Sequence, residues 1–249
     1  MAADRPMTIV EHLEELRRRI FFALAALAVG TVVSWFFADE MLAFLIKPVT
    51  GATGRGVVFV GVTEAFFVRF KLALAAGVFL SLPVLLYQIW AFVAVGLTPS
   101  ERRSALWLLP PALLLFVGGA LFSLVAIVPV GVRYLLGYKV PGVLEPMISI
   151  GAYVSFLTAF VLAFGAVFEL PIVIVFLTKI GLVTPASLAA GRRYAIAAIV
   201  VAAAVLTPGG DVFSQLMMAV PTYLLYEISI WIARFVAPRA VAIEQVEGR

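Results

Sequence analysis

The sequence contains no cysteine, only one histidine and few charged residues. Without cysteine the chain forms neither disulfides nor thiolate metal sites. The single histidine, His12, excludes a multi-histidine metal centre and an HExxH motif. Nor is there a GxSxG, Walker or GxGxxG stretch placed after a strand. Charged residues make up 13% of the 249 residues, against about 25% in a soluble domain. We therefore expect no enzyme, no catalytic residues, no metal and no cofactor.

Apolar residues, by contrast, make up 64% of the chain. This content predicts an integral membrane protein, all-α, with one membrane domain over residues 1–249 and almost no room for a soluble domain. The formal net charge is +4, but the basic residues fall at the ends of apolar runs and do not gather in one patch. That distribution favours membrane orientation over nucleic-acid binding.

Residues 8–19 are predicted to form a short amphipathic helix that lies at the membrane surface. Thr8 and Glu11 have the spacing of a capping box. Apolar residues recur at helical spacing on one face, at Ile9, Leu13, Leu16 and Ile20. The alternative is a charged leader that obeys the positive-inside rule, with Glu14–Arg18 and Glu15–Arg19 as i,i+4 pairs.

Six membrane spans are predicted at about residues 20–37, 66–95, 105–130, 152–180, 194–206 and 212–234. Thr98 and Thr184, each followed by proline, are expected helix N-caps, and Asp211 is expected to cap the last helix. The fifth apolar run has 13 residues, or ~20 Å of helix, which is short of a ~30 Å hydrocarbon core. We expect short fifth and sixth helices and a locally thinned bilayer. The alternative is an ordinary helix from which Arg192 and Arg193 snorkel.

Six spans place both termini on one side of the membrane. With that side taken as the cytoplasm, it holds twelve of the eighteen Lys and Arg residues. The positive-inside rule therefore predicts that both termini are cytoplasmic.

Glu169 is the most unusual residue in the sequence. It lies in an apolar run over 153–177 that has no other side chain charged at neutral pH, and Pro171 follows it. A carboxylate at membrane depth costs at least ~2.5 kcal/mol, so it must face protein, water or a partner. Pro171 should break the helix there. Three roles for Glu169 remain open. It is a protonated, hydrogen-bonded acid in the core, the residue that carries the ion or proton in a coupled transporter, or a polar residue on a binding face. Gln88 is a second polar residue within the spans.

Two further polar groups are candidates. Glu15 and Glu101 lie among arginines at the cytoplasmic surface, where carboxylates could dock an arginine-bearing ligand. Alternatively, Glu101 only closes a capping box and Glu15 only pairs with its own arginine. The second group, Asp211 and Gln215, lies at the outer hairpin. These features support a transporter or a receptor whose concave bundle binds a peptide or partner helix. The sequence gives little support for an intramembrane enzyme, because no histidine lies in the predicted spans.

Six motifs, in order, resemble the TatC family, the receptor subunit of the twin-arginine protein translocase. They are residues 12–19 (HLEELRRR), Pro48, 86–92 (LYQIWAF), 101–103 (ERR), 164–171 (FGAVFELP) and 206–215, where LTP precedes DVFSQ. The resemblance runs from about residue 8 to 236. Gly209 and Gly210 depart from it by lengthening the turn before Asp211.

The resemblance implies a six-helix bundle shaped like a cupped hand that recognises twin-arginine signal peptides. Glu15 and Glu101 would contact the two arginines, with Arg17 in the same surface patch. Gln88 and Glu169 would line the concave face, and Pro48, Asp211 and Gln215 would support assembly on the outer side.

The implied partners are TatA-type and TatB-type single-span proteins, lipids and further copies of the chain, in a complex that exports folded proteins with the proton-motive force. The absence of a transit peptide favours the bacterial inner membrane.

Overall fold

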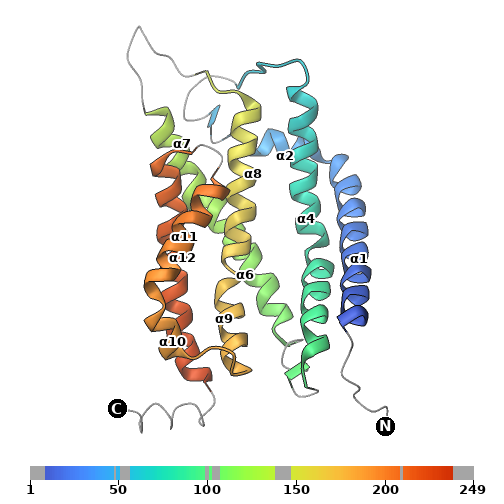
Figure 1. Ribbon diagram of the computed structural model, residues 1–249. Helices are drawn as coiled ribbons and strands as arrows, with labels where there is room; N and C mark the ends of the chain where they lie inside the picture. The colour runs from blue at the N-terminus through green and yellow to red at the C-terminus, as the bar shows by residue number, and fades with distance from the viewer. Residues whose placement is uncertain are drawn as a thin grey trace.

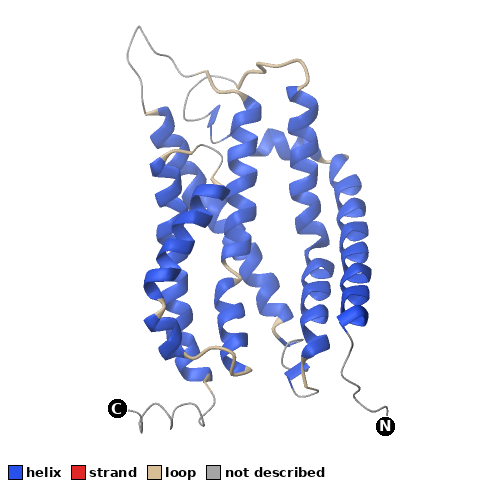
Figure 2. Cartoon of the chain, viewed as in Figure 1, coloured by secondary structure: helices blue, strands red, loops and turns tan. Residues whose placement is uncertain are grey.

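The computed structural model describes residues 9–47, 49–50, 57–98, 101–102, 107–137, 147–207 and 210–237. Apart from an isolated bridge between Val58 and Ser149, their regular structure is helical (Figures 1 and 2). The helices are α1 (Ile9–Trp35), α2 (Ala38–Leu45), α4 (Glu64–Val93), η1 (Ala94–Gly96), α6 (Leu109–Phe122), η2 (Ser123–Ile127), α7 (Val128–Leu136), α8 (Ile150–Val167), α9 (Leu170–Lys179), α10 (Pro185–Ala190), α11 (Arg192–Leu206) and α12 (Val212–Val236).

The first helix differs from its prediction. The surface helix expected over 8–19 and the span over 20–37 are one continuous helix from Ile9 to Trp35, so no separate surface helix exists in the described chain. No glycine or proline interrupts the sequence between the two segments, and the helix therefore continues through the arginines. Thr8, half of the expected capping box, lies outside the described residues.

Helix α1 lies along α4 at one edge of the molecule (Figure 1). Glycines allow the close approach: a Cβ atom on Gly30 would lie 2.7 Å from the carbonyl oxygen of Gly77. At the start of α1, the His12 ring stacks on Phe92 near the end of α4, with centroids 4.6 Å apart. The two helices are therefore held together along their length.

Four described helical segments are long and apolar enough to cross a membrane: Glu64–Gly96, Leu109–Tyr134, Ile150–Lys179 and Val212–Val236. A fifth is added if α1 and α2, which meet at a 74° bend, count as one span. The count of six spans therefore remains a prediction, because α11 has only 15 residues.

Prolines explain two irregularities in the long helical segments. The π-helical turn η2 contains Val125, the carbonyl of which would pair with the N–H that Pro129 lacks. The break between α8 and α9 falls at Phe168 and Glu169, just before Pro171 in the first turn of α9. The expected interruption at Pro171 is confirmed.

Helices α11 and α12 form the last hairpin. With 15 residues, α11 is ~22 Å long and is short as predicted. The prediction of a short sixth helix is wrong, because α12 has 25 residues and is ~37 Å long. Glu227 lies inside α12, and its carboxylate accepts two hydrogen bonds from Arg192 on α11 at 2.6 and 3.0 Å.

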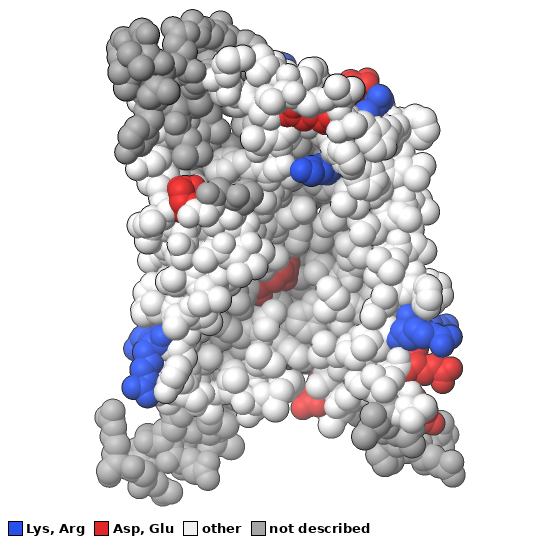
Figure 3. All heavy atoms as spheres, turned by 45° about the horizontal axis from the view of Figure 1, so that its top comes forward, with Lys and Arg blue, Asp and Glu red and all other residues white. Residues whose placement is uncertain are grey.

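Both ends of the described chain lie at the same end of the bundle, where α1 begins and α12 finishes (Figure 1). We call this the amino end. Charged side chains gather toward the two ends of the face shown in Figure 3, and an acidic side chain lies in the recessed middle of an otherwise uncharged surface. This distribution fits a chain that spans a bilayer.

Candidate functional site

Glu15 lies on α1 at the amino end and forms an ion pair with Arg19, one helical turn further on. The side chains of both residues are largely shielded, with exposed fractions of 22% and 19%. Nη1 of Arg19 also donates to Oε1 of Gln88 on α4 at 3.3 Å. Glu15, Arg19 and Gln88 thus form a polar chain across the contact between the two helices. The predicted Glu15–Arg19 pair is confirmed.

Glu101 lies at the same end, because it follows the end of α4 against which the start of α1 packs. Its Oε2 accepts hydrogen bonds from Oγ1 of Thr98 at 2.7 Å and from the Thr98 backbone N–H at 2.8 Å. The capping interaction is therefore confirmed. The hydrogen bond from the Thr98 hydroxyl has the larger effect and the one from the Thr98 N–H the smaller. Together they lower the pKa of Glu101 and keep its carboxylate ionised.

Arg17 is exposed on a different face of α1. It borders a shallow depression with Glu14, Arg18 and Phe21. Two positions along a helix are separated by about 200° of rotation, so Arg17 points away from the Glu15 side of α1.

Gln88 and Glu169 do not meet across α4. Gln88 faces α1 through its bond to Arg19, and it lines a pocket between α1 and α4. Trp90, two positions further on, faces α9 and packs edge-on against Phe176 with ring centroids 4.9 Å apart. The two predicted polar residues of the spans therefore lie on different sides of this helix.

Glu169 occupies the break between α8 and α9 and is half-buried. Its Oε1 atom is buried and has no hydrogen-bond partner among the described residues. The ring of the preceding Phe168 packs near Phe122, with centroids 5.6 Å apart. A buried carboxyl oxygen without a partner is uncommon, and none of the described residues supplies a donor for it.

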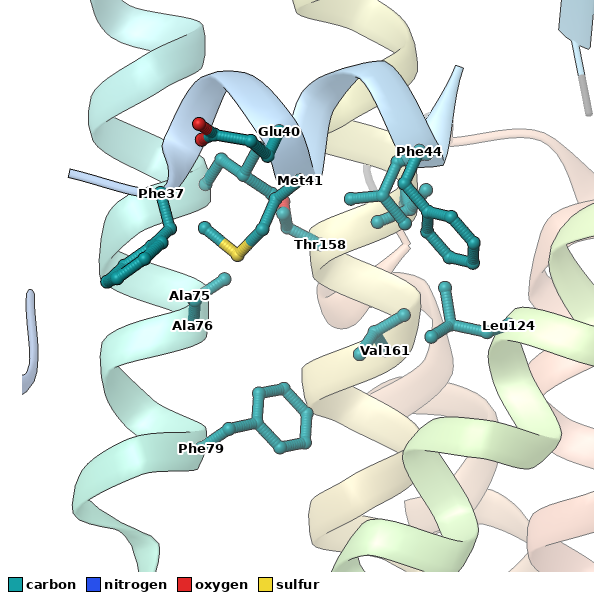
Figure 4. A pocket seen from close by; sticks show the side chains of 13 residues that line it. Phe37, Glu40, Met41, Phe44, Ala75, Ala76, Phe79, Leu124, Thr158 and Val161 are labelled. Carbon is teal, nitrogen blue, oxygen red and sulfur yellow. The ribbon is translucent and has the colours of Figure 1, made fainter. Parts of the chain in front are cut away.

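A largely apolar cavity of about 490 Å³ lies toward the opposite end, between α2, α4, η2 and α8 (Figure 4). Phe37, Met41 and Phe44 line it from the side of α2, and Ala75 and Phe79 line it from α4. Glu40 is the ionisable residue among those that line it. The volume and lining are typical of sites that hold apolar ligands.

Glu64 organises the end of the bundle opposite to the amino end, and sequence reasoning missed it. Its carboxylate accepts hydrogen bonds from the N–H groups of Val60 at 2.6 Å, Gly61 at 3.0 Å and Gly151 at 2.7 Å, and from the Ser149 hydroxyl. One side chain thereby ties the loop before α4 to the start of α8. The available signal was an acid in the first turn of a span, three residues after Gly61.

The predicted outer residues have structural contacts. Oδ1 of Asp211 accepts the Ser214 N–H at 2.7 Å, so the predicted N-cap of α12 is confirmed. The side-chain amide of Gln215 donates to the Val200 carbonyl of α11 at 3.0 Å. Pro48 lies outside the described residues.

No group of three or more His, Cys, Asp or Glu residues in the described part of the chain is placed to hold a metal ion. The polar chemistry of the described chain is that of hydrogen bonds and ion pairs.

Comparison with known proteins gives consistent results. The family model described as Sec-independent protein translocase protein (TatC) matches residues 11–221. The TatC protein of Carboxydothermus hydrogenoformans is 42% identical over 242 residues, which cover 97% of this chain and 99% of that protein. The Aquifex aeolicus TatC protein is 36% identical, with 96% and 100% covered. A crystal structure of a twin arginine translocase receptor, TatC, superposes with a TM-score of 0.82 at 36% identity, covering 90% of this chain and 99% of the other.

Proposed function

Because the chain belongs to the TatC family and is a twin-arginine translocase receptor subunit, we propose that Glu15 and Glu101 bind the two arginines of a signal peptide. The observation that carries this proposal is that both carboxylates lie at the amino end of the α1–α4 pair. Two carboxylates at one end of a membrane bundle match two adjacent guanidinium groups in charge and number.

The chemistry of the pair favours arginine over lysine. A guanidinium is planar and donates two parallel hydrogen bonds to a carboxylate, whereas an ammonium group is a point charge. The lowered pKa of Glu101 keeps it ionised for this contact, and its two bonds from Thr98 both use Oε2. Arg17 is also proposed to contact the peptide, from the other face of α1, where its side chain is exposed at the same end of the bundle.

Glu169 and Gln88, which lie on different sides of α4, are each proposed as a polar contact for a helix that packs against this chain. The buried, unpartnered Oε1 of Glu169 supports this role, because a donor from an incoming helix would satisfy it. The helices proposed to dock there are those of TatA-type and TatB-type single-span proteins or of the inserted signal. The alternative of an ion-coupled transporter has no support beyond the position of Glu169.

The chain is a multi-pass membrane protein of a bacterial family. We place the amino end in the cytoplasm because twelve of the eighteen basic residues then lie on that side. The proposed location is the bacterial inner membrane, in a larger complex of several copies with lipids that exports folded proteins with the proton-motive force. Pro48, Asp211 and Gln215 are proposed to support assembly on the outer side.

Cross-linking of a twin-arginine precursor to the chain in membranes tests the docking proposal. Glu15→Gln combined with Glu101→Gln removes both negative charges but keeps hydrogen-bonding capacity, so the cross-link should be lost while the complex still assembles. Glu14→Gln, a charge loss at an exposed site next to Glu15, is the matched control and should retain the cross-link. Undiminished cross-linking in the double variant would rule out docking at these two residues.

A further inference from the structure

One of the two proposed docking carboxylates already holds a guanidinium. Arg19 pairs with Glu15 within α1, and the same guanidinium donates to Gln88 on α4 at 3.3 Å. The exposed fraction of the Arg19 side chain is 19%, so it lies in the contact between the two helices and not in free solvent. Arg19 is therefore already bound to the Glu15 carboxylate that a peptide arginine would need.

The bonding of Arg19 is incomplete. Nη2 contacts Glu15 and Nη1 contacts Gln88, so the guanidinium is shared between two partners. The Nε atom is buried and has no hydrogen-bond partner among the described residues. A guanidinium carries five N–H donors in a fixed fork, and a carboxylate can accept two of them in parallel. An arginine that approaches Glu15 from outside is free to adopt this better geometry.

We propose that Arg19 is an internal competitor for the signal peptide: it holds Glu15 in the empty receptor, and a peptide arginine must displace it to bind. The inference rests on the proposed docking of arginine at Glu15. Gln88 gives the displaced guanidinium a place to remain, because its amide oxygen already accepts one Arg19 donor. Arg19 thereby sets the affinity threshold that a ligand must pass.

The competition also contributes to specificity. A lysine ammonium cannot form the parallel pair of bonds with Glu15, so it gains less on displacing Arg19 than an arginine does. A ligand with two adjacent arginines also gains binding free energy from its second contact, with Glu101. This gain offsets the loss of the Arg19–Glu15 contact. Removal of Arg19 should therefore tighten binding and reduce the preference for arginine over lysine. The opposite role, in which Arg19 only positions Glu15 for the ligand, predicts weaker binding on removal.

Binding of two synthetic signal peptides to the receptor in nanodiscs separates these roles. One peptide carries Arg-Arg and the other Lys-Lys at the same positions. The Arg19→Gln variant should bind the Arg-Arg peptide about two- to fivefold more tightly than the Arg18→Gln control does. This is the size of effect expected from removing a partly exposed ion pair. The variant should also narrow the affinity ratio of the two peptides.

Arg18→Gln is the matched control. It removes the same charge from the adjacent position, where the guanidinium lies 5.8 Å from the centroid of the Phe22 ring. Equal or weaker binding by Arg19→Gln relative to Arg18→Gln would overturn the inference. Arg19→Lys is the second variant, since it keeps the charge at the helix contact, and its affinity should lie between those of wild type and Arg19→Gln.

The Glu15→Gln background separates this inference from the docking proposal. If Arg19 acts by competing for Glu15, Arg19→Gln should have no effect on affinity once Glu15 is neutral. If Glu15→Gln alone leaves the affinity for the Arg-Arg peptide unchanged, the docking proposal itself fails. If Glu15→Gln weakens binding but Arg19→Gln does not tighten it, docking stands and the competitor inference is wrong.

Discussion

Replacing Gly119 by alanine should push α6 and α8 apart next to the break that holds Glu169. A Cβ atom at position 119 would collide with the Phe164 carbonyl oxygen and would lie 2.6 Å from Cγ of Phe168. Ordinary contact begins at 3.4 Å, so the two helices would have to separate by about 1 Å to relieve the closer contact, with the Phe164 carbonyl oxygen. One of the obstructing atoms belongs to the backbone, so a side-chain rotation cannot relieve the contact.

Gly118→Ala provides a control at the adjacent position. A Cβ atom there meets nothing within 4 Å, so the substitution adds only helix propensity. Overpacking costs ~1–3 kcal/mol, whereas alanine for glycine in a helix gains ~0.5–1 kcal/mol. We expect the melting temperature in detergent to fall by about 2–8 °C for Gly119→Ala and to rise by about 1–4 °C for Gly118→Ala.

Thermal unfolding of the two variants in the same detergent, monitored by circular dichroism, measures the difference. The arrangement of α6 and α8 described above requires the two melting temperatures to move in opposite directions. Equal shifts, or a higher melting temperature for Gly119→Ala, would show that the helices do not pack closely at this point.

Three further predictions concern individual polar residues. Glu169→Gln should retain more precursor export than Glu169→Ala, because the amide keeps the capacity to hydrogen-bond a partner helix. The lowered pKa of Glu101 means that its ionised form is lost only when the pH falls through that lowered pKa; Thr98→Val removes one of the bonds and should move the acid loss of peptide binding to higher pH. Asp211→Ala should destabilise the protein by ~1 kcal/mol in thermal unfolding through loss of the α12 cap, whereas Asp211→Asn should keep the cap.

Each of these predictions has a contrary outcome. Complete loss of export in both Glu169 variants would favour an ionised or proton-relaying acid. An unchanged pH profile in Thr98→Val would show that Glu101 does not carry the titrating charge of the peptide site. Equal melting temperatures for wild type and Asp211→Ala would show that the cap contributes nothing to stability.

Local sequence chemistry predicted the helix boundaries well. The caps at Thr184 and Asp211 are confirmed, and Glu101 accepts the Thr98 N–H as expected for a capping box. The break before Pro171 follows from one missing N–H group. Such features depend on neighbouring residues, so the order of residues alone is enough to predict them.

Contacts between residues far apart in the sequence were harder to predict. Glu64 is hydrogen-bonded to residues 85 and 87 positions away, and Arg19 reaches Gln88 across 69 positions. No periodicity or motif in the sequence reports which helices become neighbours. The last helix was described as short, although its predicted bounds of 212–234 end only two residues before the observed Val236.

Arginine recognition by the two carboxylates at the amino end is tested most directly by a double-mutant cycle between receptor and peptide. One side carries Glu15→Gln or Glu101→Gln, and the other replaces each signal arginine in turn with citrulline, which has a similar shape but no charge. Binding is measured in nanodiscs. We predict that each carboxylate is coupled to one of the arginines, with a departure from additivity of at least about threefold in affinity. Additive effects for every receptor–peptide combination would contradict the assignment of Glu15 and Glu101 as the arginine-binding residues.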